Sequence, residues 1–223
     1  MNEGKSQRYE ILKVKPPTDY PPEEGCYLRG NDFSPVAVVV MLNYPREQTP
    51  PEIEQLARVA IEKGAALAGT LQTENIGIEK IVTNIVSNPN IQYLVLCGIE
   101  VARHNSGDAL KCLLENGIDE RRTIVGSQAI TPYLFNIPLE SIERFRRQLT
   151  LINLLNEMNP EVVEKAVWSC YQEEPTQFQN YTLHDPGAYP EPAICSKLTW
   201  RIKKPQEIED WEIDDVLKQI GGE

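Results

Sequence analysis

The sequence predicts an α/β protein built on an open, mostly parallel sheet with helices on both faces. Two segments, "PVAVVVMLNY" (35–44) and "IQYLVLCG" (91–98), are apolar almost throughout. Because strands of parallel sheets are covered on both faces, they lack the alternation of polar and apolar residues, as these two segments do. Segments with apolar residues three or four apart follow both of them, and this alternation indicates helical crossovers between parallel strands.

The first half of the chain contains an arm, two strands and two helices. Residues 1–35 are polar and rich in proline, which favours an extended arm on the surface. After the first strand, we expect an amphipathic helix over 49–69, with prolines in its first turn. A second helix is expected over 73–90, where "NPN" ends it, and the second strand (91–98) closes with a glycine.

The second half predicts several further helices and one short strand. A helix begins at Ser106 and stops at the "ENG" of 115–117. "RTIVGS" (122–127) predicts a third short strand that also ends in glycine. Residues 137–159 predict one long helix or two shorter ones, and 160–172 predict another.

The composition divides the chain into three parts. The arm (1–35) precedes a ligand-binding domain over 36–175, and a C-terminal extension follows over 176–223. The extension contains clustered prolines, an alternating "KLTWRIK" (197–203) and an acidic helical pattern. We therefore expect a small β extension or edge hairpin, followed by a helix.

Charge and cysteine content exclude several classes of function. The 223 residues carry a net charge of −11, and an acidic surface of this kind opposes contact with nucleic acid. The cysteine count is odd and no CxxC pair occurs, which indicates free thiols in the reducing cytoplasm. The five cysteines are Cys26, Cys97, Cys112, Cys170 and Cys195. No leader peptide is visible, and no apolar run approaches the ~20 residues that span a bilayer.

The carboxyl ends of the predicted strands define the candidate site. Ligands of open parallel sheets bind beyond these ends, and Gly98 and Gly126 mark two of them. Two loops would line one crevice, 99–107 and 126–133. His104 lies in the first loop, just before a helix, where its side chain can point outward at a metal or a substrate. The alternative is a surface histidine that binds a nearby backbone group.

A metal at His104 would have to bring its other ligands. The sequence has no HxxxH, HExxH or CxxC pattern, which zinc sites require. A haem or a corrin supplies four nitrogens and needs one axial base. "HNSG" (104–107) matches the HxxG core of the cobalamin-binding signature DxHxxG, but Ala102 replaces the acid that would hydrogen-bond the second imidazole nitrogen.

"TENIGIEK" (73–80) is the second polar cluster. Glu74, Asn75 and Glu79 could bind the amide donors of a ligand. Alternatively, Asn75 caps the following helix and the two acids are solvated first-turn residues. No GxGxxG, GxxxxGK[ST] or GxSxG pattern supports a nucleotide site or a serine nucleophile.

Several long motifs together resemble a known family. The run "GTLQTENIGIEKIVTNIVSNPNIQYLVLCGIEVARHNSGDALKCLLENGID", the upstream "YPPEEGCYLRGNDFSPVAVV" and the downstream "RTIVGSQAITPYLFNIPLESIERFRRQL" cover roughly residues 20–155. They resemble the A subunit of tetrahydromethanopterin S-methyltransferase. This resemblance implies a Rossmann-like, cobamide-binding fold in which His104 is the lower axial ligand of cobalt. Cobalt, as Co(I), would take a methyl group from methyl-tetrahydromethanopterin and pass it to coenzyme M.

The resemblance also implies a set of residues around the cobamide. They come from the TEN-x-GIEK segment and from the loops that contain His104 and Gly126. With Gly98 at the end of its strand, the expected cofactor-binding residues are Thr73, Glu74, Asn75, Gly77, Glu79, Gly98, Ser106, Gly107, Gly126 and Ser127.

The chain departs from the family pattern in three places. The family ends in a membrane-spanning helix, whereas residues 180–223 are acidic, contain prolines and cannot span a bilayer. Gln72 replaces the family's lysine before TEN, and Asp108 follows HxSG. We therefore expect a soluble homologue in the cytoplasm that carries methyl groups to or from a partner methyltransferase. The oligomeric state is left open.

Two other functions remain open at this stage. One is a pterin- or nucleotide-dependent methyltransferase that uses Cys97 or Cys195 as nucleophile. The other is a cofactor-free interaction module that acts through its acidic tail.

Overall fold

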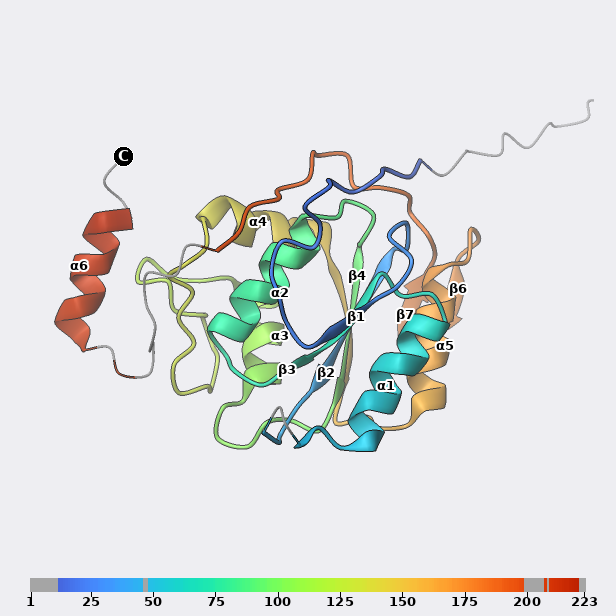
Figure 1. Ribbon diagram of the computed structural model, residues 1–223, viewed down its shortest axis with the longest axis horizontal. Helices are drawn as coiled ribbons and strands as arrows, with labels where there is room; N and C mark the ends of the chain where they lie inside the picture. Colours follow the sequence, from blue (N-terminus) through green and yellow to red (C-terminus); the bar gives the residue numbers. More distant parts are fainter. Residues whose placement is uncertain (1–11, 46–47, 199–206, 208, 221–223) are drawn as a thin grey trace, which may run out of the picture.

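A computed structural model of the chain describes residues 12–45, 48–198, 207 and 209–220, and its centre is a five-stranded sheet (Figure 1). The strand order is β1-β3-β2-β4-β5, where β2, β3, β4 and β5 are parallel and the edge strand β1 is antiparallel. The strands are β1 (Tyr27–Arg29), β2 (Val36–Met41), β3 (Leu67–Leu71), β4 (Tyr93–Gly98) and β5 (Thr150–Leu155).

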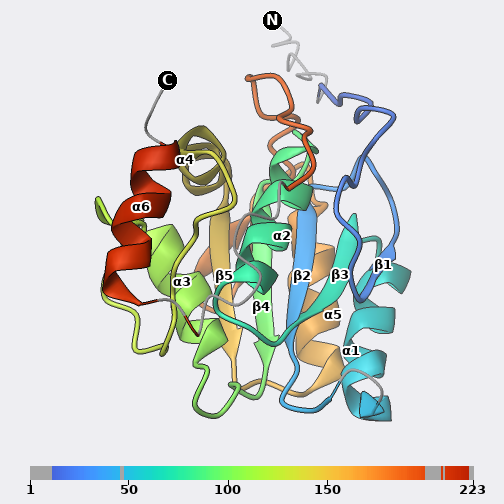
Figure 2. The same cartoon turned by 60° about the vertical axis from the view of Figure 1, so that its left-hand side comes forward.

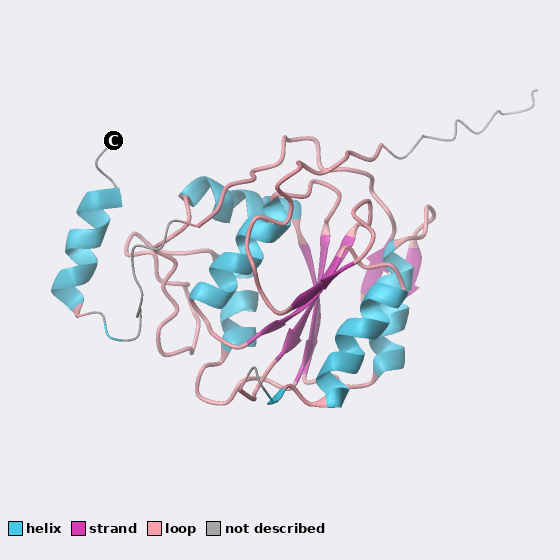
Figure 3. Ribbon diagram, in the orientation of Figure 1, coloured by secondary structure: helices cyan, strands magenta, loops and turns pink. Residues whose placement is uncertain are grey.

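Helices cover both faces of this sheet, as Figure 3 shows. One face carries α1 (Pro51–Glu62) and α5 (Pro160–Cys170). The other carries α2 (Ile76–Val86), α3 (Ser106–Asn116) and α4 (Leu139–Gln148). A hairpin, β6 (Thr176–Phe178) and β7 (Tyr181–Leu183), and a last helix, α6 (Asp210–Ile220), form the C-terminal extension. Within the described ranges, no helix has both the length and the apolar character to cross a bilayer.

The burial of β2 on both faces explains why its sequence does not alternate between polar and apolar residues. Val36, Val38 and Val40 belong to the core beneath α1 and α5. Ala37 and Val39 alternate with them and pack in the second core, beneath α2, α3 and α4. Both faces of the strand are buried, so every position is apolar, and the predicted α/β class is confirmed.

Two strands were missed because their sequences also fit helices. Residues 67–69 were assigned to the end of the preceding helix, but α1 ends earlier and Gly64 has a φ of +102°, which terminates the helical turn. Residues 150–155 were assigned to a long helix, but they pair with β4 along their whole length. Pairing and burial of Ile152 and Leu154 decide this structure, because the local pattern does not.

Two smaller expectations also differ from the structure, and a third is not tested by it. Residues 122–127 form only isolated antiparallel bridges, such as Ile118 with Ile124, rather than a strand of the main sheet. Residues 27–29 of the expected arm form the edge strand β1. Most of the alternating stretch 197–203 lies outside the described residues.

The direction in which successive strands are added to the sheet reverses between β2 and β4. The chain leaves β2 towards β3 on one side and later returns to place β4 on the other side. Loops that leave the carboxyl ends of these two strands therefore diverge, which is where open α/β sheets bind ligands. Gly98, with a φ of +90°, allows the strand ends to approach closely, since a Cβ there would lie 2.8 Å from the backbone nitrogen of Met41.

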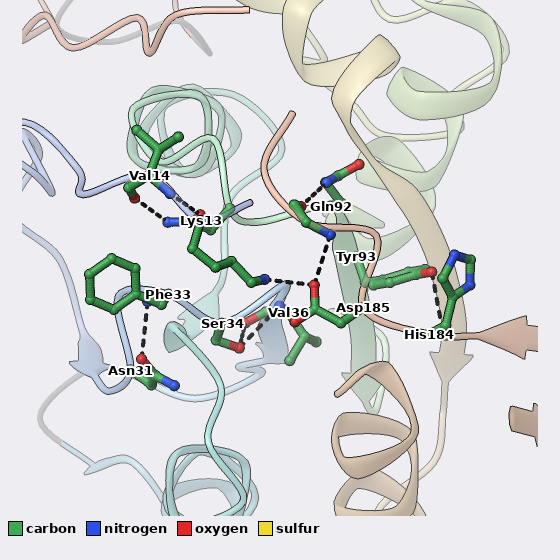
Figure 4. A network of polar contacts seen from close by, with 12 residues as sticks. Lys13, Val14, Asn31, Phe33, Ser34, Val36, Gln92, Tyr93, His184 and Asp185 are labelled. Carbon is green, nitrogen blue, oxygen red and sulfur yellow. Dashed lines mark hydrogen bonds and ion pairs between the residues drawn. The ribbon is translucent and has the colours of Figure 1, made fainter. Parts of the chain in front are cut away.

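The opposite edge of the sheet is closed by the two terminal segments, as Figure 4 shows. Lys13 Nζ binds Asp185 Oδ1 at 2.6 Å, which joins the N-terminal arm to the segment after β7. Asn90 accepts a hydrogen bond from Val14 N and donates one to Val14 O. The amide of Gln92 also donates to Gly187 O. These contacts lie before β2 and β4 begin, at the end of the sheet opposite Gly98 and the loop that contains His104.

Candidate functional site

His104 lies in a tight loop at the carboxyl end of β4. Its neighbours Arg103 and Asn105 both have left-handed backbone conformations, with φ of 71° and 47°. Non-glycine residues with positive φ are uncommon and cluster at functional sites. The loop is anchored at both ends, because Glu100 N donates to Asn156 Oδ1 and Asn105 N donates to Val101 O. It presents His104 with a side chain that is 49% exposed.

Glu74 is the hydrogen-bond partner of this imidazole. Its Oε2 lies 2.8 Å from His104 Nδ1, and its side chain is only 1% exposed. Its Oε1 accepts hydrogen bonds from Thr131 N (3.1 Å) and Thr131 Oγ1 (2.9 Å). Burial works to raise the pKa of Glu74, but hydrogen bonds from its own backbone amide, His104 and Thr131 outweigh burial and hold the pKa below its ordinary value. Glu74 is therefore ionised at neutral pH.

The ionised carboxylate fixes the tautomer of His104. A carboxylate can only accept hydrogen bonds, so Nδ1 must carry the proton. In the neutral imidazole, Nε2 then holds the free lone pair. A half-exposed ring therefore offers one oriented basic nitrogen beyond the sheet, which is the arrangement of a single metal ligand.

The "TENIGIEK" segment both caps a helix and supports the site. Asn75 Oδ1 accepts a hydrogen bond from Ile76 N, and Thr73 Oγ1 accepts one from Gly77 N, so both side chains satisfy the first amides of α2. Asn75 Nδ2 also donates to Thr131 Oγ1 at 3.1 Å. The capping interpretation of Asn75 is thus confirmed, whereas that of Glu74 as a solvated acid is wrong.

Glu79 is buried as well and holds the same distant segment. Its carboxylate accepts hydrogen bonds from Asn136 N at 2.7 Å and Asn136 Nδ2 at 2.9 Å. Burial raises the pKa of Glu79 above its ordinary value, although the hydrogen bonds from Asn136 and the positive charge of Arg122 oppose the rise. Glu79 lies 1% exposed and fixes the end of the segment that begins at Thr131.

Glu100 was not singled out from the sequence, yet it organises the start of α3. Its carboxylate accepts hydrogen bonds from Gly107 N (2.9 Å) and Asp108 N (2.7 Å). Ser106 Oγ donates to Gln72 O at 3.2 Å, which ties the same helix start to the end of β3. An acid shortly before a helix is favoured by the helix dipole, and this signal could have identified Glu100.

Thr131 is the second residue that the sequence did not reveal. It is separated from Glu74 by 57 positions and binds the carboxylate with both its amide and its hydroxyl. The 127–131 loop is also tied to α3, because Gln128 N donates to Asp108 Oδ2 and Gln128 O accepts from Asn105 Nδ2. Only the folded chain brings these residues together.

Other expected residues lie further from His104. Gly126 lies beside Asn116, at the opposite end of α3 from His104, and an 11-residue helix is about 16 Å long. The Ser127 hydroxyl accepts a hydrogen bond from Ala129 N within its own loop. Among the described residues, no three His, Cys, Asp or Glu side chains gather into a cluster that could hold a metal ion.

The two candidate nucleophiles have unfavourable surroundings. Cys97 is fully buried at the end of β4, and burial, with the charge of Glu157, raises the pKa of its thiol to about 12. Burial and the charge of Asp19 raise the pKa of Cys195. The structure therefore does not favour a cysteine mechanism.

Exposed apolar side chains lie on the loops around His104. Tyr44 follows β2 and is 47% exposed, Ile99 follows β4 and is 49% exposed, and Ile130 precedes Thr131 and is 68% exposed. The site therefore combines a half-exposed imidazole with a buried carboxylate at the carboxyl end of β4, in an α/β protein with a mostly parallel sheet.

Comparison with known proteins identifies the family. The family model of the A subunit of tetrahydromethanopterin S-methyltransferase (MtrA) matches residues 13–198. In Methanothermobacter thermautotrophicus, the A subunit numbered 1 is 36% identical over 189 residues, covering 84% of this chain and 70% of that protein. The A subunit numbered 2 of the same organism is 36% identical over 190 residues, covering 84% of this chain and 92% of that protein. The chain belongs to this MtrA family.

A third relative extends the agreement. The corresponding A subunit of Methanosphaera stadtmanae is 35% identical over 199 residues, covering 89% of this chain and 69% of that protein. The resemblance expected from the sequence motifs is thus confirmed. The family match ends at residue 198, so α6 lies beyond it.

Proposed function

We propose that this chain binds a cobamide at the carboxyl edge of its sheet and that His104 Nε2 is the lower axial ligand of cobalt. Bound cobalt would supply the centre that takes a methyl group from a methylated pterin and yields it to a thiol such as coenzyme M. The observation that carries this proposal is the 2.8 Å contact between His104 Nδ1 and the buried Glu74, which leaves Nε2 directed away from its protein partner.

The donor set fits a corrin. A corrin provides four equatorial nitrogens, so the protein needs to contribute only one axial base. His104 is such a base, on a loop whose two ends are fixed by hydrogen bonds. Small changes at the left-handed residues Arg103 and Asn105 would move the imidazole without disturbing β4 or α3.

Glu74 replaces the acid of the DxHxxG signature, which is missing from this chain. In DxHxxG sites an acid two residues before the histidine binds its second nitrogen, but Ala102 occupies that position here. Glu74 supplies the carboxylate from the start of α2 instead. By accepting a hydrogen bond from Nδ1–H, Glu74 raises the basicity of Nε2 and fixes the orientation of the ring.

The surroundings of His104 suit a broad, partly apolar ligand. Tyr44, Ile99 and Ile130 leave apolar area exposed on the loops around His104, and a flat macrocycle would cover such area. A Cβ at Gly107 would lie 2.8 Å from Glu100 Oε2, so this glycine allows Glu100 to approach the start of α3.

We further propose that a partner methyltransferase delivers or receives the methyl group. The side chain of His104 is 49% exposed, so a second protein could reach a group bound there. The expectation of a cytoplasmic protein stays a prediction, and the five free cysteines fit a reducing compartment.

A cobalamin titration followed by visible absorption tests the proposal. We expect the wild-type protein to bind cob(III)alamin with a spectrum typical of imidazole coordination. His104→Ala should lose that signature, because no other oriented imidazole is available among the described residues of this edge. His184 is the chain's second histidine, and His184→Gln is the matched control, since His184 N contacts Tyr93 at the opposite end of β4.

Glu74→Gln tests the role of the carboxylate. The glutamine amide can donate to Nδ1, which would move the imidazole proton to Nε2 and remove the lone pair that binds cobalt. We therefore expect weaker imidazole coordination with the fold retained. The same spectrum in wild type and His104→Ala would contradict His104 as the ligand, and no bound corrinoid at any concentration would contradict the proposal as a whole.

A further inference from the structure

α6 packs on the segment that connects α3 to α4. Figure 2 shows this helix beside that segment, at the side of the sheet covered by α3 and α4. Ile213 of α6 and Phe135 of the segment bury each other to 2% and 3% exposure. Tyr133 and Leu217 complete this small apolar cluster, which is separate from the two main cores.

The backbone of the segment explains why it offers an apolar surface. Successive side chains of extended backbone point to opposite sides. Leu134 is fully buried in the core beneath α2, α3 and α4, so its neighbours Tyr133 and Phe135 point away from that core. Their rings stack with centroids 5.4 Å apart. Without α6, this aromatic pair would lie exposed on the surface.

α6 has the composition of a helix that docks by one face. Ile213 and Leu217 are four residues apart, so they share a face, and both contact the aromatic pair. Exposed acids such as Asp214 and Asp215 lie on the same helix. The aromatic pair lies within the family match at 13–198, whereas α6 lies beyond it. The surface thus lies within the part of the chain that the family model matches, and its occupant lies outside that part.

Residues 131–136 of this segment also hold the two buried acids of the site. Thr131 binds Glu74 with its amide and its hydroxyl. Asn136 binds Glu79 with its backbone amide and its side-chain amide. Phe135, which α6 covers, lies between these two anchors. Displacing α6 would leave the middle of this segment free to move.

We propose that Tyr133 and Phe135 form a binding surface for an acidic amphipathic helix, which α6 fills within the same chain, and that its occupation holds Thr131 on Glu74 and so positions His104. Ile213 is the residue of α6 that acts on the position of Thr131, through its contact with Phe135. The link to His104 rests on the proposed function of that residue, but the docking surface does not depend on it.

Amide hydrogen exchange of the full chain tests the docking. In Ile213→Asp, a charge in the apolar contact should release α6, and the amides of residues 131–136 should exchange at least about tenfold faster. The amides of β4 should keep their wild-type rate, which shows that the chain remains folded. Asp214→Asn is the matched control, because Asp214 is exposed on the same helix. Leu217→Ser provides a milder second variant.

A peptide then tests the surface itself. A synthetic peptide of residues 207–220, added to the Ile213→Asp chain, should restore slow exchange at residues 131–136. The same peptide with aspartate at position 213 should not. Unchanged exchange in both Ile213→Asp and Leu217→Ser would overturn the proposal, and so would accelerated exchange that the native peptide does not reverse.

The amide of Thr131 separates positioning from simple support. Thr131 N donates to Glu74 Oε1 at 3.1 Å, so this amide should exchange faster once α6 is released if α6 holds that hydrogen bond. Accelerated exchange at residues 133–136 with an unchanged rate at Thr131 would overturn the positioning role. None of these measurements contains a corrinoid, so their results stand whether or not the cobalamin titration succeeds.

Discussion

Replacing Glu74 with alanine should destabilise the protein substantially. The carboxylate accepts three hydrogen bonds, one from His104 and two from Thr131, with donor–acceptor distances of 2.8–3.1 Å. Hydrogen bonds to an ionised group contribute about 1.5–3 kcal/mol each. His104 is half exposed and Thr131 is partly buried, so water replaces part of the loss. Counting about 1.5 kcal/mol once for His104 and once for Thr131 gives a cost of about 3 kcal/mol in the free energy of unfolding.

Urea unfolding followed by circular dichroism measures this cost. With a slope of about 2–3 kcal/mol per molar urea, the midpoint of Glu74→Ala should fall by about 1 M. Glu140→Ala is a suitable control, because Glu140 is an exposed first-turn acid of α4. A loss below about 1 kcal/mol would refute the argument that this carboxylate joins α2 to the 131–136 segment.

The pH dependence of the free energy of unfolding gives a second measure of the contribution of Glu74. The pKa of Glu74 is lower in the folded chain than its ordinary value of 4.5. Its contribution to stability is therefore fully present above about pH 4.5 and is lost as the pH falls through the lowered folded pKa. The stability difference between wild type and Glu74→Gln should shrink in this acidic range. A difference that stays constant down to the acid transition would contradict the assigned ionisation.

Three further predictions concern other residues. Burial raises the pKa of Glu79 above 4.5, so its protonated form favours the folded state at low pH, and this contribution is lost as the pH rises through the raised pKa. Glu79→Gln should therefore gain stability relative to wild type as the pH rises above about 4.5, measured by urea unfolding. Gly98→Ala should cost at least about 2 kcal/mol in urea unfolding, because φ is +90° and the new Cβ would lie 2.8 Å from the backbone nitrogen of Met41; a neutral effect would contradict the close approach of β2 and β4. A thiol reagent at pH 8 should modify the exposed Cys26 rapidly and leave the buried Cys97 unmodified in the folded chain, as mass spectrometry of peptides would show.

The local signals in the sequence were strongest for elements with one consistent pattern. The all-apolar run of β2 predicted a strand covered on both faces, and both cores confirm this. Ser106 and the glycine at 117 correctly predicted the limits of α3, where Gly117 has the φ of +77° that favours glycine after a helix. The sequence also placed His104 in a loop immediately after β4, because the strand, its terminal glycine and the helix start are all local features.

The local signals failed where pairing between distant segments decides the structure. Residues 150–155 contain leucines and an asparagine that fit a helix, and only their pairing with β4 makes them a strand. Residues 27–29 join the sheet through their register with β3, which no short pattern encodes. Strand pairing is a contact between separate parts of the chain, so single-segment patterns could not reveal it.

The sequence by itself determined the α/β class, the loop that carries His104 and, through its long motifs, the family of the chain. Only the tertiary structure decided what surrounds that histidine. Glu74 is 30 positions from His104, Thr131 is 57 positions from Glu74, and α6 lies further still along the chain. Hydrogen bonds and apolar contacts among such residues exist because the sheet order brings β3, β4 and the segment before α4 to one edge. The physical reason is that the basicity and orientation of an imidazole depend on its neighbours in space rather than on its neighbours in sequence.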